Sequence, residues 1–330
     1  MRAFETILQF YPPRRFATTA LREFTQAPAS ALHLPYAQQQ QLLQWGSDGE
    51  NNIHQQLYTG SGFVVGVIHI QISVPTLLEL TCATSFNTLL YSLEGYGFLR
   101  LQGYGCLPLF QDSYTLHYVP GDRHSLFLPA GNYRYFLVSP GMLLANLVQE
   151  HAPVQELVRR EELVHQSGSM AARQEITVNL LQMIQQFAHM PATNGNTALL
   201  VESKINDLLR YFHLQALSSP IDLLSTAGMT LFLASHLHLP AQRLIQLLKK
   251  KYFTTNSSLQ RCWQQNHTQA FRSFVTQIRM QYALYLLVAE NRSIAEVIEF
   301  IQYQNPSDFS RQFRKTHGFS PSAARQFVVF

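Results

Sequence analysis

The chain has 330 residues, enough for two domains, and its apolar content of 46% is typical of a globular protein rather than a disordered one. Only 13% of the residues are charged, and they are unevenly placed. Residues 241–330 carry twelve Lys or Arg against four Asp or Glu, a balance of +8, whereas the first 240 residues carry twelve against sixteen, a balance of −4. The basic C-terminal third predicts a polyanionic partner.

The first residues, MRAFETILQFYPPRRF, are interrupted by charge and proline and lack the apolar core of a secretory signal. No apolar run approaches the length of a membrane-spanning helix. Cys82, Cys106 and Cys262 are too dispersed for a disulfide framework or a zinc cluster. We therefore expect a cytoplasmic protein without membrane contact. Residues 1–50 show no clear pattern, and AQQQQLLQW within them reads as a short helix or a solvated polar tract.

Residues 51–140 change to a period of two. VIHIQIS alternates Ile68, Ile70 and Ile72 with polar residues, as a half-buried strand does. Five further strand-like pieces follow: FNTLLYSL, GFLRLQG, YTLHYVP, HSLFLPA and YRYFLVSP. EGYG, GYGC, PGD and PAGN separate strand-like pieces and have the composition of turns. Short strands with regular turns predict a small β-sandwich or barrel.

Residues 141–217 form a predicted helical linker. The segments MLLANLVQEHAPVQELVRREELV, EITVNLLQMIQQFAHM and ALLVESKINDLLRYFHLQAL each place Leu, Ile, Val and Phe at helical spacing. Such helices allow two arrangements, pairing with a second copy of the chain or packing within one chain.

The basic region, residues 218–330, begins with a helical pattern and a short turn. LPAQRLIQLLKKKYF opens at Pro240, which suits a helix entrance. After the turn TTN, SSLQRCWQQN predicts a second helix with Leu259 and Trp263 on one side, since residues four apart share a helix face. Helix, short turn and second helix is the layout of a helix-turn-helix unit.

A second copy of this layout begins at Ser293. This residue suits a helix N-cap, and Glu296 completes a capping box for RSIAEVIEFI. A short connection, QYQN, leads to NPSDFSRQFRKTHGFSP, in which Phe309 and Phe313 form an apolar seam and Gly318 suits the helix end. The rest of the helix surface would be covered by Ser307, Asp308, Ser310, Arg311, Arg314 and Lys315, which gives it a basic, hydroxyl-bearing outer face.

The two copies correspond position by position. Leu259 and Trp263 occupy the places of Phe309 and Phe313, and Arg261 matches Arg311 fifty residues later. Between the copies, FRSFVTQIRMQYALYLL carries an apolar stripe that predicts one long connecting helix. The sequence therefore predicts two readers of the DNA major groove joined by a rigid helix.

At this point the sequence resembles a known family. RMQYALYLL…SIAEVIEFIQYQNPSDFSRQFRKTHGFSPSAAR is similar to the DNA-binding domain of AraC/XylS-type bacterial transcription regulators, over about residues 240–327. The resemblance is carried by Ala283, Leu286, Leu287, Ile294, Ala295, Glu296, Phe309, Ser310, Arg311, Phe313, Gly318, Ser320, Pro321 and Arg325. The first unit, KKYFTTNSSLQRCW, is similar to the subgroup related to the pyochelin regulator.

The resemblance implies seven helices, with two recognition helices entering successive major grooves on one face of DNA. The candidate DNA-binding residues are Ser257, Gln260, Arg261, Gln264, Ser307, Ser310, Arg311, Arg314 and Lys315. Arg can grip guanine with two hydrogen bonds, Gln can grip adenine, and Ser can serve several base edges. Arg314 and Lys315 lie farther round the helix and are better placed for phosphate.

The sequence departs from the family pattern at three positions. Gln302 stands where the second turn usually has glycine, Ile298 where a small residue is usual, and Ala324 where an aromatic is usual. The resemblance further implies a cupin-like N-terminal domain, so the expected fold class is α+β. A metal cupin needs a close His-x-His and a Glu, whereas His69, His117 and His124 are dispersed, so we expect no metal and no cofactor.

We expect a sequence-specific DNA-binding transcription regulator, an activator modulated by a small molecule or partner at its N-terminal domain. The expected partners are double-stranded DNA, RNA polymerase, an effector molecule and a second copy of the chain. Two alternatives stay open: a constitutive regulator whose β-domain binds only protein, and an enzyme with an appended DNA-binding module. An apolar pocket in the β-domain favours a sensor, and a completely filled one favours the protein-binding alternative.

Overall fold

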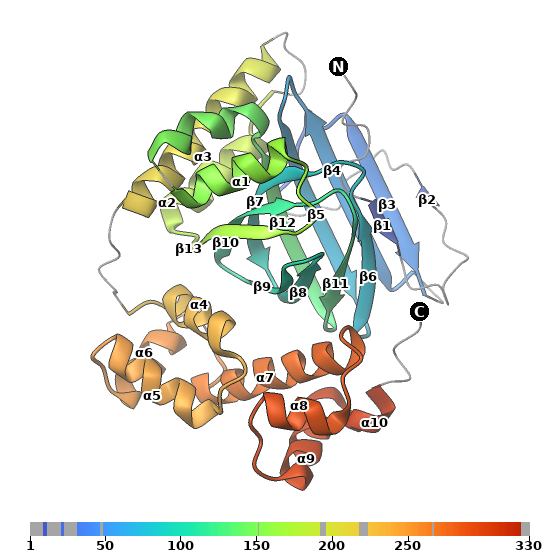
Figure 1. The fold of residues 1–330 in the computed structure, drawn as a ribbon, viewed down its shortest axis with the longest axis vertical. Coiled ribbons are helices and arrows are strands. Elements are labelled where there is room, and N and C mark those ends of the chain that lie inside the picture. Colours follow the sequence, from blue (N-terminus) through green and yellow to red (C-terminus); the bar gives the residue numbers. More distant parts are fainter. Residues whose placement is uncertain are drawn as a thin grey trace. The chain divides into compact units, whose positions relative to one another are not determined.

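The computed structural model describes residues 9–11, 21–22, 32–46, 49–150, 152–191, 196–217, 224–265 and 267–324 (Figure 1). The chain divides into two compact units, residues 1–74 with 78–219 and residues 220–330 with 75–77. The first unit combines two sheets with helices, and the described residues of the second unit from residue 224 onward form helices joined by short turns. The expected α+β class is therefore confirmed. No helix in the described residues is long and apolar enough to cross a membrane.

Two sheets form the frame of the first unit. The larger sheet has the order β13-β10-β7-β12-β5-β4-β3-β2, and the smaller has the order β1-β6-β11-β8-β9. The strands are β1 Gln9–Tyr11, β2 Leu21–Arg22, β3 Gln39–Trp45, β4 Asn51–Thr59, β5 Val64–Ile72, β6 Thr76–Thr81, β7 Phe86–Glu94, β8 Tyr96–Leu101, β9 Gly105–Phe110, β10 Ser113–Val119, β11 Arg123–Leu128, β12 Gly131–Ser139 and β13 Ser169–Glu175.

The period of two along β5 distributes its side chains between two cores. Ile68, Ile70 and Ile72 are buried with residues from both sheets, so they fill the space between the sheets. Val65 and Val67 point to the opposite face and join a separate core with helical residues. Successive side chains of a strand alternate between faces, and here both faces are covered.

The helices of the first unit cover the outer face of the larger sheet (Figure 1). They are the 3-10 segment η2 Gly141–Glu150 and the α-helices α1 Ala152–Glu162, α2 Val178–Ala188 and α3 Thr197–Leu217. Phe187 of α2 lies 5.1 Å from Phe136 of β12, and Phe212 of α3 lies 6.4 Å from Tyr114 of β10, between ring centroids. Packing within the chain, one of the two arrangements expected for these helices, is therefore present.

Two segments differ from the sequence-based expectation. AQQQQLLQW contains strand β3 rather than a helix or a polar tract, because Leu43 and Trp45 point into the core between the sheets and the strand pairs along its length with β4. The linker is not wholly helical, since β13 adds an edge strand beside β10. Much of residues 1–50 lies outside the described residues.

The second unit contains seven described helices, the number that the resemblance implies. They are α4 Thr226–His236, α5 Ala241–Lys251, α6 Asn256–Gln264, α7 Phe271–Val288, α8 Ile294–Phe300, α9 Pro306–His317 and α10 Pro321–Ala324. The long helix α7 is buried on most of its surface and contacts α5, α6, α8, α9 and α10. The predicted connecting helix is therefore the centre of this unit.

Candidate nucleic-acid interface

The first helix-turn-helix unit consists of α5 and α6. The side chain of Thr255 caps α6 by accepting a hydrogen bond from the backbone N of Ser258 at 3.2 Å. Leu259 and Trp263 are almost completely buried, as their four-residue spacing predicts. The indole Nε1 of Trp263 donates to the carbonyl of Gln269 at 2.9 Å, so its polar edge is satisfied as well.

The second unit consists of α8 and α9 and repeats this construction. The predicted capping box of Ser293 and Glu296 is present at the start of α8. Asn305 caps α9 by accepting from the backbone N of Ser307 at 2.8 Å, fifty residues after Thr255. Phe309 and Phe313 are fully buried, and α9 ends at Gly318 in the left-handed conformation, with φ of 81°.

In each unit a histidine ring packs against the buried aromatic residue of the recognition-helix candidate. The His267 ring lies 3.9 Å from the Trp263 ring, and the His317 ring lies 4.5 Å from the Phe313 ring, between centroids. The Nε2 atom of His317 lies 3.0 Å from the carbonyl oxygen of Met280 in α7, which fixes α9 to the connecting helix. Burial lowers the pKa of His317, so the ring is neutral in this contact at neutral pH.

The outer faces of α6 and α9 carry the predicted DNA-binding residues. Ser257, Arg261 and Gln264 of α6 and Ser307, Arg311, Arg314 and Lys315 of α9 are exposed, whereas Gln260 and Ser310 are half-buried. An open groove beside α9 is lined by Pro306, Ser307, Ser310, Arg311, Arg314, Lys315 and Ser320. The five α9 candidates therefore share one surface.

The candidate residues of α6 lie beside a second open groove. Ser257 and Gln260 line it together with Lys249 of α5 and Arg272 of α7. The Oε1 atom of Gln260 also accepts a hydrogen bond from the backbone N of Phe271 at 3.1 Å. This bond satisfies one of the free N–H groups at the start of α7 and engages Oε1 of Gln260, whereas the Nε2 amino group can still donate to a base.

Arg311 is held by a local ion pair. Its Nη2 atom lies 2.6 Å from Oδ1 of Asp308, one turn earlier on α9, and both side chains are largely exposed. An ion pair in water contributes little to stability, so the guanidinium can exchange this partner for a base or a phosphate. The pair also orients Arg311 along the outer face of α9.

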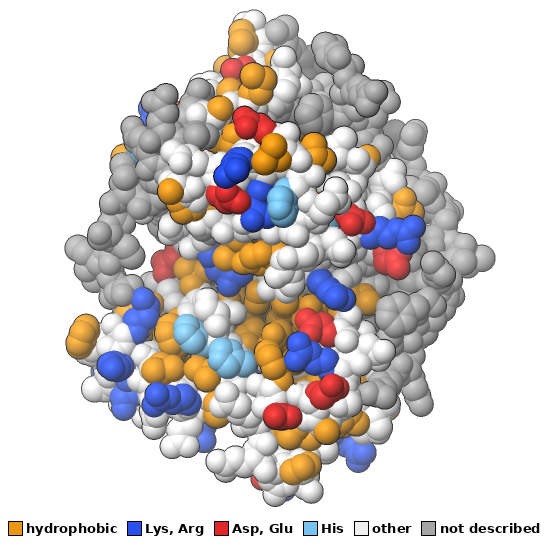
Figure 2. All heavy atoms as spheres, viewed as in Figure 1, with side chains coloured by type: hydrophobic (Ala, Val, Ile, Leu, Met, Phe, Trp, Pro, Cys, Tyr) orange, Lys and Arg blue, Asp and Glu red, His pale blue; other side chains and the backbone are white. Residues whose placement is uncertain are grey.

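Basic side chains are placed differently in the two units (Figure 2). In the first unit, Lys249, Lys250 and Lys251 end α5, and Figure 2 shows Lys and Arg gathered over the α5 and α6 region. In the second unit, Arg314 and Lys315 lie on the recognition helix itself. Each unit therefore presents positive charge beside its predicted recognition helix, where it can attract phosphates.

The turns of both units contain a non-glycine residue in the left-handed region. Gln302 has φ of 55° and Phe253 has φ of 47°, and the Phe253 side chain is 96% exposed. The absent glycine noted in the sequence thus leaves Gln302 in a conformation that costs about 1 kcal/mol or more. Of the other two departures, Ile298 is half-buried and Ala324 is fully buried.

Sequence reasoning missed the role of Arg279. This residue lies in α7, is 3% exposed, and donates through Nη2 to the carbonyl of Ile301, where α8 ends. Its guanidinium lies 5.2 Å from the ring centroid of Tyr303, and burial lowers its pKa. A basic residue within the apolar stripe of FRSFVTQIRMQYALYLL was the available signal. Arg279 attaches the second turn to the connecting helix, whereas Arg325 lies outside the described residues.

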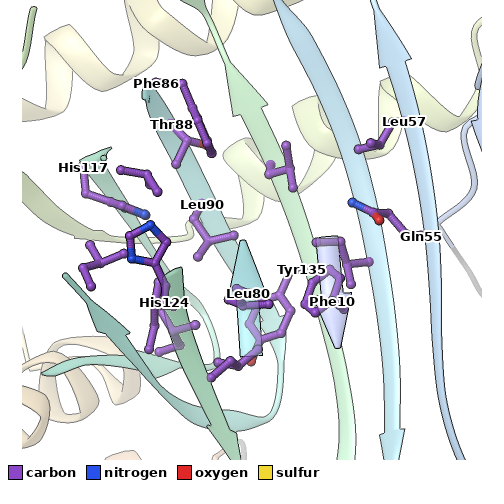
Figure 3. Close-up of a pocket in the computed structure, with 17 residues that line it drawn as sticks. Phe10, Gln55, Leu57, Leu80, Phe86, Thr88, Leu90, His117, His124 and Tyr135 are labelled. Atoms are coloured by element: carbon purple, nitrogen blue, oxygen red, sulfur yellow. The ribbon is translucent and has the colours of Figure 1, made fainter. Parts of the chain in front are cut away.

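A second candidate site lies inside the first unit. A cavity of about 70 Å³ between the two sheets is lined mainly by apolar side chains, and Gln55, His117, His124 and Tyr135 also reach it (Figure 3). Among the described residues, no group of three or more His, Cys, Asp or Glu side chains is placed to hold a metal ion. The site is a mostly apolar pocket between the sheets.

Comparison with known proteins finds relatives both of the helix-turn-helix region and of most of the chain. The profile of a family described as "Helix-turn-helix domain" matches residues 233–326. The chain is 21% identical over 275 residues to the Msm operon regulatory protein of Streptococcus mutans, covering 76% of this chain and 98% of that protein.

Two solved structures are also similar. The C-terminal domain of AraT, a response regulator from Geobacillus stearothermophilus, is 24% identical and aligns with 34% of this chain and 88% of its own, with a TM-score of 0.28. ToxT from Vibrio cholerae, with an unsaturated fatty acid bound, is 12% identical and aligns with 82% and 98% of the two chains, with a TM-score of 0.31. The matched domain and the regulatory relative together identify the chain as a DNA-binding transcription regulator. It carries an AraC-type helix-turn-helix domain at its C-terminal end.

Proposed function

We propose that the chain reads two half-sites of its operator, one with α6 and one with α9. The observation that supports this most strongly is the repeated construction: each recognition helix has a side-chain cap and a buried aromatic seam, and both contact α7. A shared rigid helix holds two readers at a fixed separation. Successive major grooves on one face of DNA are roughly 34 Å apart, which sets the expected spacing of the half-sites.

Arg261 and Arg311 read bases in this proposal. Both are exposed on the outer faces of their helices, and a guanidinium can form two hydrogen bonds with guanine. Ser257, Gln264, Ser307 and Ser310 contact nearby base edges, and Gln260 joins them through its Nε2 amino group. Arg314 and Lys315 hold phosphates and so set position rather than sequence preference.

We further propose that a small molecule in the cavity of the first unit modulates DNA binding. Side chains fill most of the space between the sheets, so the size of the cavity alone does not favour a ligand-sensing domain. The Nε2 atom of Gln55 and the hydroxyl of Tyr135 favour it, because both line the cavity and neither has a hydrogen-bond partner among the described residues. A domain that only binds protein has no need of unpaired polar groups in its interior.

Pairing with a second copy through α2 and α3 also belongs to this proposal. Val178 and Leu181 of α2 and Leu199 and Leu200 of α3 are exposed, at 72%, 38%, 66% and 42%. Apolar side chains on helices whose other faces are already buried are suited to association. Sedimentation of the full chain at several concentrations tests this point, and contact with RNA polymerase stays a prediction.

The central test uses the full chain and a pool of duplexes with random sequence. We expect selection to yield one site with two informative clusters about one helical turn apart. Affinity for that site should fall linearly with the logarithm of salt concentration, because each neutralised phosphate releases counterions. Equal affinity for all duplexes, or affinity that salt does not change, would contradict the proposal.

A further inference from the structure

Two consecutive residues of α7 are attached to opposite ends of α9. Arg279 contacts the turn that precedes α9, because its Nη2 atom donates to the carbonyl of Ile301 and its Cζ atom lies 5.2 Å from the ring centroid of Tyr303. The carbonyl oxygen of Met280 lies 3.0 Å from Nε2 of His317, the last residue of α9. One turn of α7 therefore holds both ends of this predicted recognition helix.

Between these two attachments, aromatic rings form a continuous row along the buried side of α9. The Tyr303 ring lies 5.6 Å from the Phe309 ring, and the Phe309 ring lies 5.6 Å from the Phe313 ring, between centroids. The Phe313 ring lies 4.5 Å from the His317 ring. Because Arg279 contacts the first ring and the last ring contacts Met280, the row is joined to α7 at both ends.

Arg279 contacts the residues on both sides of a strained one. Gln302, with φ of 55°, stands between Ile301 and Tyr303. A residue other than glycine keeps such a conformation only where its surroundings hold it there. The hydrogen bond to Ile301 and the contact with the Tyr303 ring both hold this segment, so Arg279 fixes the course of the chain into α9.

A cation at this buried position is costly if stability is its only role. Arg279 is 3% exposed, burial lowers its pKa, and within the described residues its Nε atom has no hydrogen-bond partner. The carbonyl and the ring that it contacts carry no full negative charge, so they do not neutralise the guanidinium. A planar guanidinium, however, binds a carbonyl and stacks on a ring only in a narrow range of geometries. Arg279 is therefore suited to fixing a direction.

The other recognition-helix candidate, α6, is attached to a different part of α7. Gln260 accepts from the backbone N of Phe271 at 3.1 Å, and the Trp263 ring lies 5.2 Å and 4.4 Å from the Phe271 and Phe274 rings, between centroids. These contacts are with the first turn of α7, whereas α9 is held at residues 279–280. The direction of α9 relative to α6 therefore depends on the contacts of Arg279 and His317.

We propose that Arg279 is a positioning residue for DNA recognition. By holding the turn between α8 and α9 against α7, it sets the direction of α9 relative to α6 and thereby the separation of half-sites that the chain accepts. This inference rests on the proposed reading of two half-sites. One added base pair moves the second half-site by about 3.4 Å and rotates it by about 34° around the duplex, which a fixed α9 cannot follow.

The experiment measures the affinity of the full chain for three duplexes. They are the selected site, the same site with one base pair added between its two clusters, and the same site with one removed. The parent should bind both altered duplexes about tenfold or more weakly than the selected site. Arg279→Met removes the hydrogen bond and the cation, and it should bind all three duplexes within about threefold of one another. Arg279→Lys keeps one donor without the planar group, so its spacing penalty should lie between the two.

Three further variants separate positioning from stability. Tyr303→Leu removes the ring that Arg279 contacts and should relax the spacing preference, whereas Tyr303→Phe keeps the ring and should behave like the parent. Leu284→Ala is the matched control, because Leu284 is fully buried in α7 and takes part in none of the contacts above. It should lower the melting temperature and keep the parental ratio of affinities. All affinities are measured at a temperature at which circular dichroism shows each variant to be folded.

The ratio of affinities decides between the outcomes, since a purely structural role lowers all three affinities by one common factor. Parental ratios in Arg279→Met and Tyr303→Leu would overturn the inference and leave the reading of two half-sites intact. Equal relaxation in Leu284→Ala would overturn it as well, because any weakening of α7 packing would then have the same effect. Equal affinity of the parent for all three duplexes would refute the reading of two half-sites, and the role of Arg279 with it.

Discussion

The two helix-turn-helix units share their buried seam and differ in their outer surface. Leu259 and Trp263 of α6 and Phe309 and Phe313 of α9 are all almost completely buried. The positive charge, in contrast, lies at the end of α5 in the first unit and on α9 in the second, where α8 instead carries Glu296 and Glu299. The seam determines how each recognition helix sits on α7, and the outer surface is left free to differ between half-sites.

The strongest test of the shared seam removes one large aromatic from each unit. Trp263→Ala and Phe313→Ala should each destabilise the chain by about 3–5 kcal/mol, as large-to-small changes of buried aromatics do. Urea unfolding of each variant measures the loss. Phe253→Ala is the matched control, because that side chain is 96% exposed and its removal should change stability by about 0.5 kcal/mol or less. A midpoint like that of the parent in either core variant would break the equivalence of the units.

The turn of the second unit offers a smaller effect of opposite sign. Gln302→Gly should raise the free energy of unfolding by about 1 kcal/mol, because glycine adopts positive φ without steric cost. Gln302→Ala is the control and should leave stability close to that of the parent, since alanine meets the same left-handed strain. Denaturant unfolding distinguishes them, and equal stability of the glycine and alanine variants would show that Gln302 is not strained.

The salt dependence of DNA binding tests whether the differently placed basic residues of the two units both contact phosphate. Lys249→Ala in α5 and Arg314→Ala in α9 should each lower the slope of log affinity against log salt by about 0.9, if each removes one phosphate contact. Lys204→Ala in the first unit is the control, since its Nζ lies 3.7 Å from Asp207 and it belongs to α3. A slope reduced by only one of the two variants would mean that the units contribute unequally to phosphate contact.

The smallest expected effect concerns pH and the histidine that closes the second seam. The folded-state pKa of His317 is lowered by burial, so below pH of about 6.5 the unfolded chain binds a proton that the folded chain does not. The contribution of His317 to the free energy of unfolding is therefore fully present above its pKa in the unfolded chain. It falls as the pH drops toward its pKa in the folded chain. His317→Gln should reduce the loss of stability between about pH 7 and pH 5, measured by urea midpoints. An identical dependence of the urea midpoint on pH in the parent and the variant would show that folding does not lower the pKa of His317.

Local patterns in the sequence predicted much of the second unit. Four-residue spacing revealed the seams of α6 and α9, and Ser293 and Glu296 revealed the start of α8, because caps and seams depend on neighbours within one helix. The glutamine-rich β3 was missed because QQQLLQW has three consecutive Gln and two adjacent Leu, and so lacks the alternation of a half-buried strand before its partner β4 is known.

The details of the candidate sites depend on contacts between distant segments. The Gln260 amide caps α7, and Arg279 reaches the end of α8, 22 residues further along the chain. The cavity gathers Gln55 and Tyr135 from β4 and β12, which are not adjacent in the sheet. No local pattern predicts such meetings, because they follow from packing rather than from sequence spacing.

The most direct test of the central claim compares Arg261→Ala with Arg311→Ala in the selection from random duplexes. A bidentate Arg–guanine contact contributes about 1–3 kcal/mol of discrimination. If two units read two half-sites, each variant should lose base preference in one cluster and keep it in the other, and the two variants should affect opposite clusters. A selected site with a single informative cluster, or unaltered preference in both variants, would contradict this account.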